Sequence, residues 1–160
     1  LDQKRVAFGF PDILFGPDDA YARLIQRQEE TGADVVLGLH LIEDPAVWDM
    51  VDCDEEGRIH AVVMKPVSTT LTYGWCCAVW TPRFSTFLHD FLRADETKRN
   101  LSRLATTAND PGGDLAVGVV LQAALKSGLV LQSVKFPNER YLDIGTPENL
   151  LKAVREFGQK

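Results

Sequence analysis

The sequence lacks a long apolar run and an excess of basic residues. No apolar stretch approaches the ~20 residues that a membrane-spanning helix needs, so we expect no membrane segment. The formal net charge is −6 at pH 7. Because non-specific binding to nucleic acid or to an anionic membrane requires a basic face, this charge argues against both kinds of partner.

The sequence also lacks a clustered set of metal-binding or disulfide-forming side chains. An odd number of cysteines with an adjacent pair is a poor disulfide framework, and no Cys or Cys/His pattern has the spacing of a zinc site. Two adjacent cysteines on a strand point to opposite faces, so at least one belongs to the core. The pattern favours a reducing, cytoplasmic location. The three histidines are scattered along the sequence, and none has a second ligand or catalytic residue at the spacing of a metal site or a catalytic triad. These residues are Cys53, Cys76 and Cys77, and His40, His60 and His89.

The chain contains enough apolar residues to fold as one α/β domain over residues 1–160. Hydrophobic residues make up 45% and charged residues 25% of the sequence, values typical of a folded protein. The chain opens on Leu1 rather than Met, without a signal peptide, and reaches an apolar strand pattern almost at once. We interpret this opening as that of a truncated or processed protein.

The first quarter of the chain has the pattern of a strand, a helix and a second strand. Apolar runs at residues 5–10 and 33–41 predict buried strands. Between them, an amphipathic pattern from Pro17 predicts a helix that Gly32 ends. This order predicts a βαβ unit with a parallel strand pair and a right-handed crossover.

Further elements follow in alternation. Residues 50–54 and 58–64 predict a β-hairpin with Gly57 in the turn. Later elements are a strand at 74–81, a helix at 82–92, a mobile loop ending near 109–113, a helix at 114–127 and a strand at 129–136. A short strand end at 141–145 precedes a last helix, with Thr146 as its N-cap and Pro147 in its first turn. The whole predicts an α/β fold: a mostly parallel, Rossmann-like sheet flanked by helices, with a β-hairpin insertion.

Three charged residues lie where a ligand could be bound. Asp12 follows the first strand, and the rim at the carboxyl ends of parallel strands is where open α/β sheets bind ligands. Asp143 lies between a strand and a helix that Thr146 already caps, which leaves its carboxylate available. Lys65 ends the hairpin, and because Pro66 follows it we expect an extended backbone. A phosphate contact at Lys65 requires that both aspartates share its cleft.

Four motifs together resemble the sugar-1-phosphate nucleotidylyltransferases, with glucose-1-phosphate thymidylyl- and uridylyltransferases the nearest in appearance. They are Phe10-Pro11-Asp12, Met64-Lys65-Pro66, Gly74 and the run from Tyr141 to Glu148. The similarity covers nearly all 160 residues, in the same order. The run Leu-Asp-Ile-Gly-Thr-Pro-Glu is its most specific part.

The resemblance implies roles for several residues. Asp12 and Asp143 match the two aspartates that hold Mg²⁺ in that family, and Lys65 matches a lysine that contacts the sugar phosphate. Gly74 matches a glycine beside the sugar, and the same matching motifs place Tyr141 and Gly145 at the substrate. The implied reaction takes a nucleoside triphosphate and a sugar-1-phosphate. The resemblance does not decide whether the chain forms a homo-oligomer.

The sequence departs from this family in several places. The glycine-rich nucleotide-binding loop that opens the family's domain has no counterpart, so we expect these 160 residues alone to be inactive. Met64 stands where the family has a sugar-binding glutamate, Trp48-Asp49 where it has an aromatic residue and a glycine, and Cys76 where tyrosine is common.

Two other functions stay open. The first is a non-catalytic sugar-phosphate- or nucleotide-binding module, or an assembly module, derived from the family. The second is a metal-dependent glycosyltransferase, because Asp52-Cys53-Asp54 matches the Asp-x-Asp pattern of a metal-binding motif. A solvated acidic hairpin turn accounts better for that tripeptide.

Overall fold

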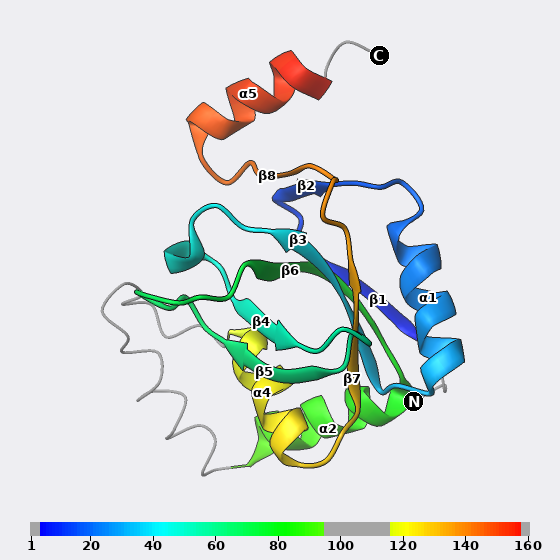
Figure 1. The fold of residues 1–160 in the computed structure, drawn as a ribbon. Coiled ribbons are helices and arrows are strands. Elements are labelled where there is room, and N and C mark those ends of the chain that lie inside the picture. Colours follow the sequence, from blue (N-terminus) through cyan, green and yellow to red (C-terminus); the bar gives the residue numbers. More distant parts are fainter. Residues whose placement is uncertain (1–3, 95–115, 158–160) are drawn as a thin grey trace.

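A computed structural model describes residues 4–94 and 116–157 of the chain (Figure 1). Its centre is a six-stranded sheet in the order β5-β4-β6-β3-β7, with β1 paired to β6. The strands are β1 (Val6–Gly9), β3 (Val35–Leu41), β4 (Met50–Cys53), β5 (Ile59–Val63), β6 (Tyr73–Trp80) and β7 (Leu131–Lys135). The predicted hairpin is confirmed as β4 and β5, and Gly57 in its turn has a φ of 80°.

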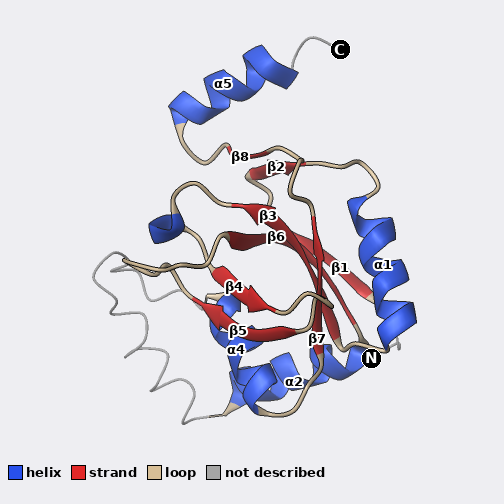
Figure 2. Cartoon of the chain, in the orientation of Figure 1, coloured by secondary structure: helices blue, strands red, loops and turns tan. Residues whose placement is uncertain are grey.

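Helices cover both faces of this sheet (Figures 1 and 2). On one face, α1 (Ala20–Thr31) buries Ala20 and Leu24 against strand residues that include Cys77. On the other face, α2 (Pro82–Arg93) and α4 (Val117–Lys126) enclose the larger core around Trp75 and Phe84. Burial raises the pKa of the Cys77 thiol to about 12. Both adjacent cysteines are buried, so the predicted core role is confirmed for the pair.

The expected parallel pairing of the first and second predicted strands is wrong. Strand β6 lies between them and is antiparallel to both, so that Trp80 is opposite Val6 on one side and Val35 on the other. Among the paired strands of the described chain, only β3 and β7 are parallel. The sheet is therefore mixed rather than mostly parallel, while the α/β Rossmann-like class is confirmed.

A second, two-stranded ribbon lies beside the main sheet. It pairs β2 (Ile13–Phe15) with β8 (Tyr141–Asp143) in antiparallel register. Strand β2 is absent from the sequence prediction, because three residues are too short to show a period. The last helix, α5 (Pro147–Phe157), follows the ribbon. The predicted cap is confirmed, because the N–H of Asn149 donates to Thr146 Oγ1 at 3.3 Å.

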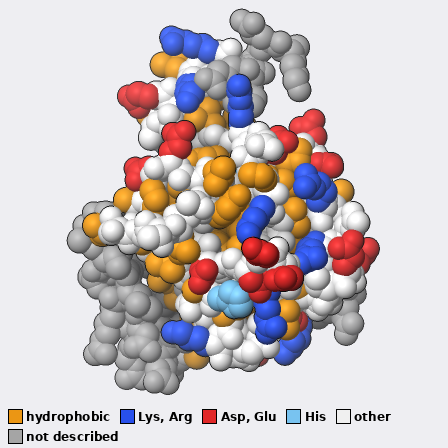
Figure 3. Space-filling model, in the orientation of Figure 1, with side chains coloured by type: hydrophobic (Ala, Val, Ile, Leu, Met, Phe, Trp, Pro, Cys, Tyr) orange, Lys and Arg blue, Asp and Glu red, His pale blue; other side chains and the backbone are white. Residues whose placement is uncertain are grey.

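The last features of the fold are a connecting turn, the undescribed segment and the surface charge. A short 3₁₀ turn, η1 (Pro45–Val47), connects β3 to β4. The predicted loop at 109–113 and the start of the helix predicted from Asp114 lie outside the described residues. No helix in the described part is long and apolar enough to cross a membrane. On the face shown in Figure 3, acidic and basic side chains are interspersed rather than gathered into a basic patch.

Candidate functional site

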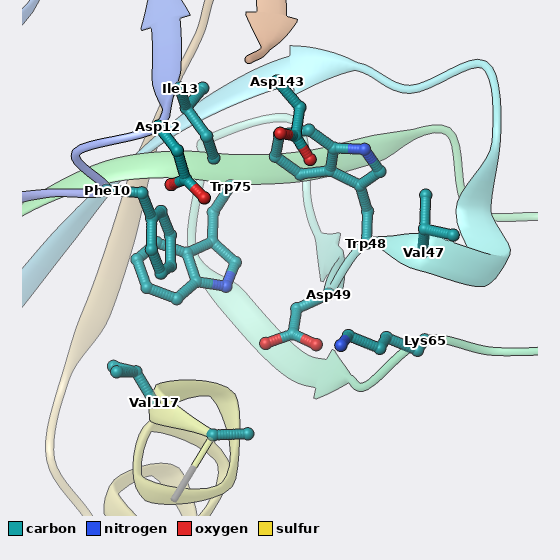
Figure 4. Close-up of a pocket in the computed structure, with 11 residues that line it drawn as sticks. Phe10, Asp12, Ile13, Val47, Trp48, Asp49, Lys65, Trp75, Val117 and Asp143 are labelled. Atoms are coloured by element: carbon teal, nitrogen blue, oxygen red, sulfur yellow. The ribbon is translucent and has the colours of Figure 1, made fainter. Parts of the chain in front are cut away.

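A cleft of about 300 Å³ lies at the ends of β1, β4 and β5, between the ribbon and the first turn of α4. The three charged residues predicted from the sequence all line it, although they come from distant parts of the chain (Figure 4). The charged side chains of the cleft are Asp12, Asp49, Lys65 and Asp143, and its aromatic side chains are Phe10, Trp48 and Trp75. Three carboxylates against one ammonium make the cleft a place for a cation as well as for a phosphate.

The ribbon brings Asp12 and Asp143 together. Ile13 is directly opposite Asp143 in the β2–β8 ladder, and the N–H of Ile144 donates to the Asp12 carbonyl at 2.7 Å. The N–H of Gly145 donates to Asp143 Oδ1 at 2.8 Å. A Cβ at Gly145 would lie 3.0 Å from Asp143 Oδ1 and 3.3 Å from Asp12 Oδ2, so both carboxylates border the same point beside this glycine. A side chain at this position would crowd the pair.

Lys65 reaches the cleft from a left-handed backbone. Its φ is 38°, which corrects the extended conformation expected before Pro66. Its N–H donates to the Trp48 carbonyl at 3.1 Å, and this contact holds the turn against the neighbouring segment. A left-handed conformation costs a residue with a side chain roughly 1–2 kcal/mol. Strained residues cluster at functional positions, and the Lys65 ammonium points toward Asp49 (Figure 4).

Asp49 is a cleft residue that the sequence marks only as a departure from the family pattern. Its half-buried carboxylate faces the Lys65 ammonium and the indole nitrogen of Trp75 (Figure 4). Burial raises the pKa of Asp49, and the charge of Lys65 and the indole N–H of Trp75 oppose that rise. The two charged groups do not come within the 4.0 Å of an ion pair.

Of the four predicted substrate-binding residues, only Lys65 lines the cleft, and Gly74, Tyr141 and Gly145 lie outside its lining. A Cβ at Gly74 would collide with Ile42 and lie 3.2 Å from the Asp49 carbonyl, so this glycine lets β6 approach the segment that carries Asp49. The Tyr141 hydroxyl accepts the N–H of Glu43 at 3.3 Å, and its ring packs edge-on against Trp48 at 5.0 Å. Gly74 and Tyr141 therefore pack against the segment that forms the cleft wall, and the contact of all three residues with a substrate stays a prediction.

The Asp-x-Asp tripeptide runs from the end of β4 into the hairpin turn, which begins at Asp54. Asp54 Oδ1 accepts the N–H of Arg58 at 2.7 Å, and Asp54 Oδ2 lies 3.2 Å from the His60 ring. Neither Asp52 nor Asp54 lines the cleft. Within the described chain, no group of three or more His, Cys, Asp or Glu side chains is placed to hold a metal ion. The contacts of Asp54 with Arg58 and His60 therefore support a structural role in the turn.

The fold of this chain is similar to that of solved sugar-phosphate nucleotidyltransferases. It superimposes on the apo form of a UDP-glucose pyrophosphorylase with a TM-score of 0.72 and 14% identity, over 99% of this chain and 55% of that one. It superimposes on the inositol-1-phosphate CTP transferase from T. maritima with a TM-score of 0.64 and 18% identity, over 98% and 55% of the two chains.

In sequence, the chain is similar to a glucose-1-phosphate thymidylyltransferase from Actinoplanes sp. The two are 28% identical over 143 residues, which make up 89% of this chain and 41% of that protein. No family model matches the sequence. The resemblance to sugar-1-phosphate nucleotidylyltransferases is therefore confirmed in sequence and in fold. The chain spans less than half the length of this relative and about half the length of the solved structures.

Proposed function

We propose that this chain carries the sugar-phosphate- and Mg²⁺-binding part of a nucleotidyltransferase. The reaction transfers a nucleotidyl group from a nucleoside triphosphate to a sugar-1-phosphate and releases pyrophosphate. One observation carries the proposal: Asp12, Lys65 and Asp143, which match three motifs of that family, line one cleft (Figure 4). We further propose a cytoplasmic location, which the free thiols of Cys76 and Cys77 favour.

The reaction brings two polyanions together, and charge is its main obstacle. A phosphate oxygen of the sugar-1-phosphate attacks the α-phosphorus of the triphosphate and forms a new P–O bond. The bond from that phosphorus to the oxygen bridging to the β-phosphate breaks, and pyrophosphate leaves with the electron pair. In this proposal the Lys65 ammonium binds the sugar phosphate and offsets its charge. Positioning and charge neutralisation then supply most of the rate enhancement.

The carboxylates of Asp12 and Asp143 fit Mg²⁺ by their chemistry. Magnesium in phosphate-binding sites takes one or two protein carboxylates and completes its shell with water and phosphate oxygens. The two side chains border the same point at Gly145, and the hydrogen bond from the Gly145 N–H orients Asp143. When bound, Mg²⁺ neutralises phosphate charge and polarises the reacting phosphate. A structural zinc site would need about four protein ligands, which this pair does not supply.

Calorimetric titration of the 160-residue chain tests the binding assignment. We expect Mg²⁺-dependent binding of glucose 1-phosphate. Asp12→Asn and Asp143→Asn should remove the dependence on Mg²⁺, and Lys65→Ala should weaken phosphate binding at least tenfold, because a charge-assisted contact is lost. Asp52→Asn is the matched control, since it removes the same charge from an exposed position on β4. A wild-type chain that binds neither Mg²⁺ nor the sugar phosphate would contradict the proposal.

A non-catalytic binding or assembly module is the second candidate. The carboxylate of Asp49 beside Lys65 favours it, because a negative charge at that point competes with a phosphate for the ammonium. A pyrophosphate-release assay with nucleoside triphosphates and sugar-1-phosphates separates the two functions in the full-length protein. Turnover assigns the enzyme, whereas binding of both ligands without turnover assigns the module.

A further inference from the structure

The Asp49 carboxylate packs closely against the first turn of α4, which forms one wall of the cleft. A Cβ at Gly118, in the first turn of α4, would collide with this carboxylate and would lie 3.3 Å from Met64 Cγ. The helix backbone and the Met64 side chain therefore pack around the acid. Glycine at position 118 makes the room that the carboxylate needs. The open direction is toward the cleft, where the oxygens face Lys65 and Trp75 (Figure 4).

Asp49 and Lys65 have opposite preferences for a ligand. An ionised carboxylate only accepts hydrogen bonds, whereas an ammonium only donates them. A phosphate group suits Lys65 and is repelled by Asp49, because both are negatively charged. A hydroxyl group suits Asp49, which loses part of its hydration in the cleft and gains from a donor there. Neighbouring groups of this kind match a ligand that carries a phosphate and hydroxyls close together.

Aromatic rings supply the third part of this arrangement. Phe10 and Trp75 pack with their ring centroids 4.9 Å apart, and both rings line the cleft. A sugar ring offers an apolar C–H face and a polar hydroxyl edge, so an aromatic wall beside a carboxylate is complementary to it.

We propose that Asp49 is a specificity-determining residue of the cleft, whose carboxylate accepts hydrogen bonds from sugar hydroxyls while Lys65 binds the phosphate. This inference rests on the proposed function and adds to it the residue that recognises the sugar ring. It assigns a role to an acid that stands where the family has a glycine.

The first test compares two ligands that share a phosphate. Glucose 1-phosphate and inorganic phosphate are titrated into the wild-type chain, into Asp49→Asn and into the control Asp52→Asn, at pH 7 with Mg²⁺. Asp49→Asn should weaken glucose 1-phosphate binding about tenfold, as expected for loss of a hydrogen bond to a charged group. Binding of inorganic phosphate should be unchanged or tighter, since a like charge has been removed. Equal losses for both ligands, or no loss for either, overturn the inference.

The second test uses the ligand to separate recognition from a structural effect. Deoxy analogues of glucose 1-phosphate, each lacking one ring hydroxyl, are titrated into the same proteins. At least one deoxy analogue should bind the wild-type chain about tenfold more weakly than the parent sugar, and Asp49→Asn should abolish that difference. Deoxy penalties that persist in full in Asp49→Asn overturn the inference.

The two proposals fail in different ways. A wild-type chain that binds glucose 1-phosphate through Lys65, with deoxy penalties that are independent of Asp49, leaves the proposed function standing and overturns this inference alone. A wild-type chain that binds no sugar phosphate overturns both. Circular dichroism and thermal unfolding of each variant verify that the proteins compared are folded.

Discussion

The carboxylates of Asp12 and Asp143 border the same point beside Gly145, where a Cβ would lie within 3.3 Å of both, although the two acids come from opposite ends of the chain. The β2–β8 ladder places Ile13 opposite Asp143, and Asp12 precedes Ile13 directly. The two acids therefore depend on a short ribbon for their relative position. Their neighbour Gly145 offers a way to disturb the pair without removing either carboxylate.

Gly145→Ala should weaken Mg²⁺ binding by about tenfold, an effect typical of changes behind the ligands themselves. The added Cβ would lie 3.0 Å from Asp143 Oδ1 and 3.3 Å from Asp12 Oδ2, so both carboxylates must shift by a few tenths of an ångström. Because Gly145 is exposed, the free energy of unfolding should change by less than about 1 kcal/mol. Calorimetric Mg²⁺ titration and chemical denaturation measure the two quantities. Unchanged Mg²⁺ affinity would place the metal elsewhere.

Lys65→Gly should be more stable than Lys65→Ala, and both variants should bind phosphate more weakly than the wild-type chain. The φ of 38° at Lys65 suits glycine, which adopts left-handed conformations without the steric cost of a Cβ. The matched variant is Lys65→Ala, which loses the ammonium but keeps the strain. We expect Lys65→Gly to be about 1 kcal/mol more stable than Lys65→Ala in urea denaturation, with phosphate binding weakened alike in both. Equal stability of the two variants would show that position 65 is unstrained.

Asp49→Asn should be more stable than the wild-type chain at neutral pH. Burial raises the pKa of Asp49 above its ordinary value of 3.8, so the folded chain holds this proton at a pH where the unfolded chain has released it. The wild-type stability therefore falls as pH rises through that window, and the full cost is present above it. The variant avoids this cost, on the order of 1 kcal/mol at pH 7. The difference in free energy of unfolding between Asp49→Asn and the wild-type chain should shrink toward pH 3.8, as measured by parallel denaturation curves. A difference that does not change with pH would contradict a raised pKa at Asp49.

His40 should make the fold sensitive to mild acid. Its side chain is fully buried, Nε2 donates to the Gly16 carbonyl at 2.8 Å, and Nδ1 has no hydrogen-bond partner within the described residues. Burial lowers the pKa of His40, and the Gly16 contact and the Glu139 charge oppose that shift. The unfolded chain takes up this proton near the ordinary value of 6.5, whereas the folded chain takes it up only at lower pH. Stability is thus fully present above pH 6.5 and falls as pH drops below it.

His40→Gln removes the titrating group and keeps an N–H donor for the Gly16 carbonyl. The variant should lose this part of the pH dependence between pH 6.5 and 5, at a baseline cost of roughly 1–2 kcal/mol. His60→Gln is the control, because His60 is exposed and should leave the dependence in place. Thermal unfolding across this pH range gives the comparison. A wild-type slope that survives His40→Gln would assign the acid sensitivity to another group.

Local features of the chain determined most of its secondary structure. Apolar runs mark the strands, Gly32 ends α1 in a left-handed conformation at φ 65°, and Gly57 turns the hairpin. Thr146 caps α5 as its side chain chemistry predicts. These outcomes depend on residues a few positions apart, and steric and hydrogen-bonding preferences of that range are readable in a sequence. The motifs around Asp12, Lys65 and Asp143 were readable for the same reason.

Tertiary structure alone decided how these pieces meet. The insertion of β6 between β1 and β3 depends on pairing between distant strands, and an apolar run does not encode its neighbour. Long-range contacts also hold Lys65 in a left-handed turn against the Trp48 carbonyl, against the local preference of a residue before proline. Asp49 lies in the cleft because Gly74 and Gly118, two glycines from other elements, leave room for its backbone and its side chain. The sequence by itself determined the candidate acids and lysine, while the packing of distant segments decided that four charged side chains share one cleft.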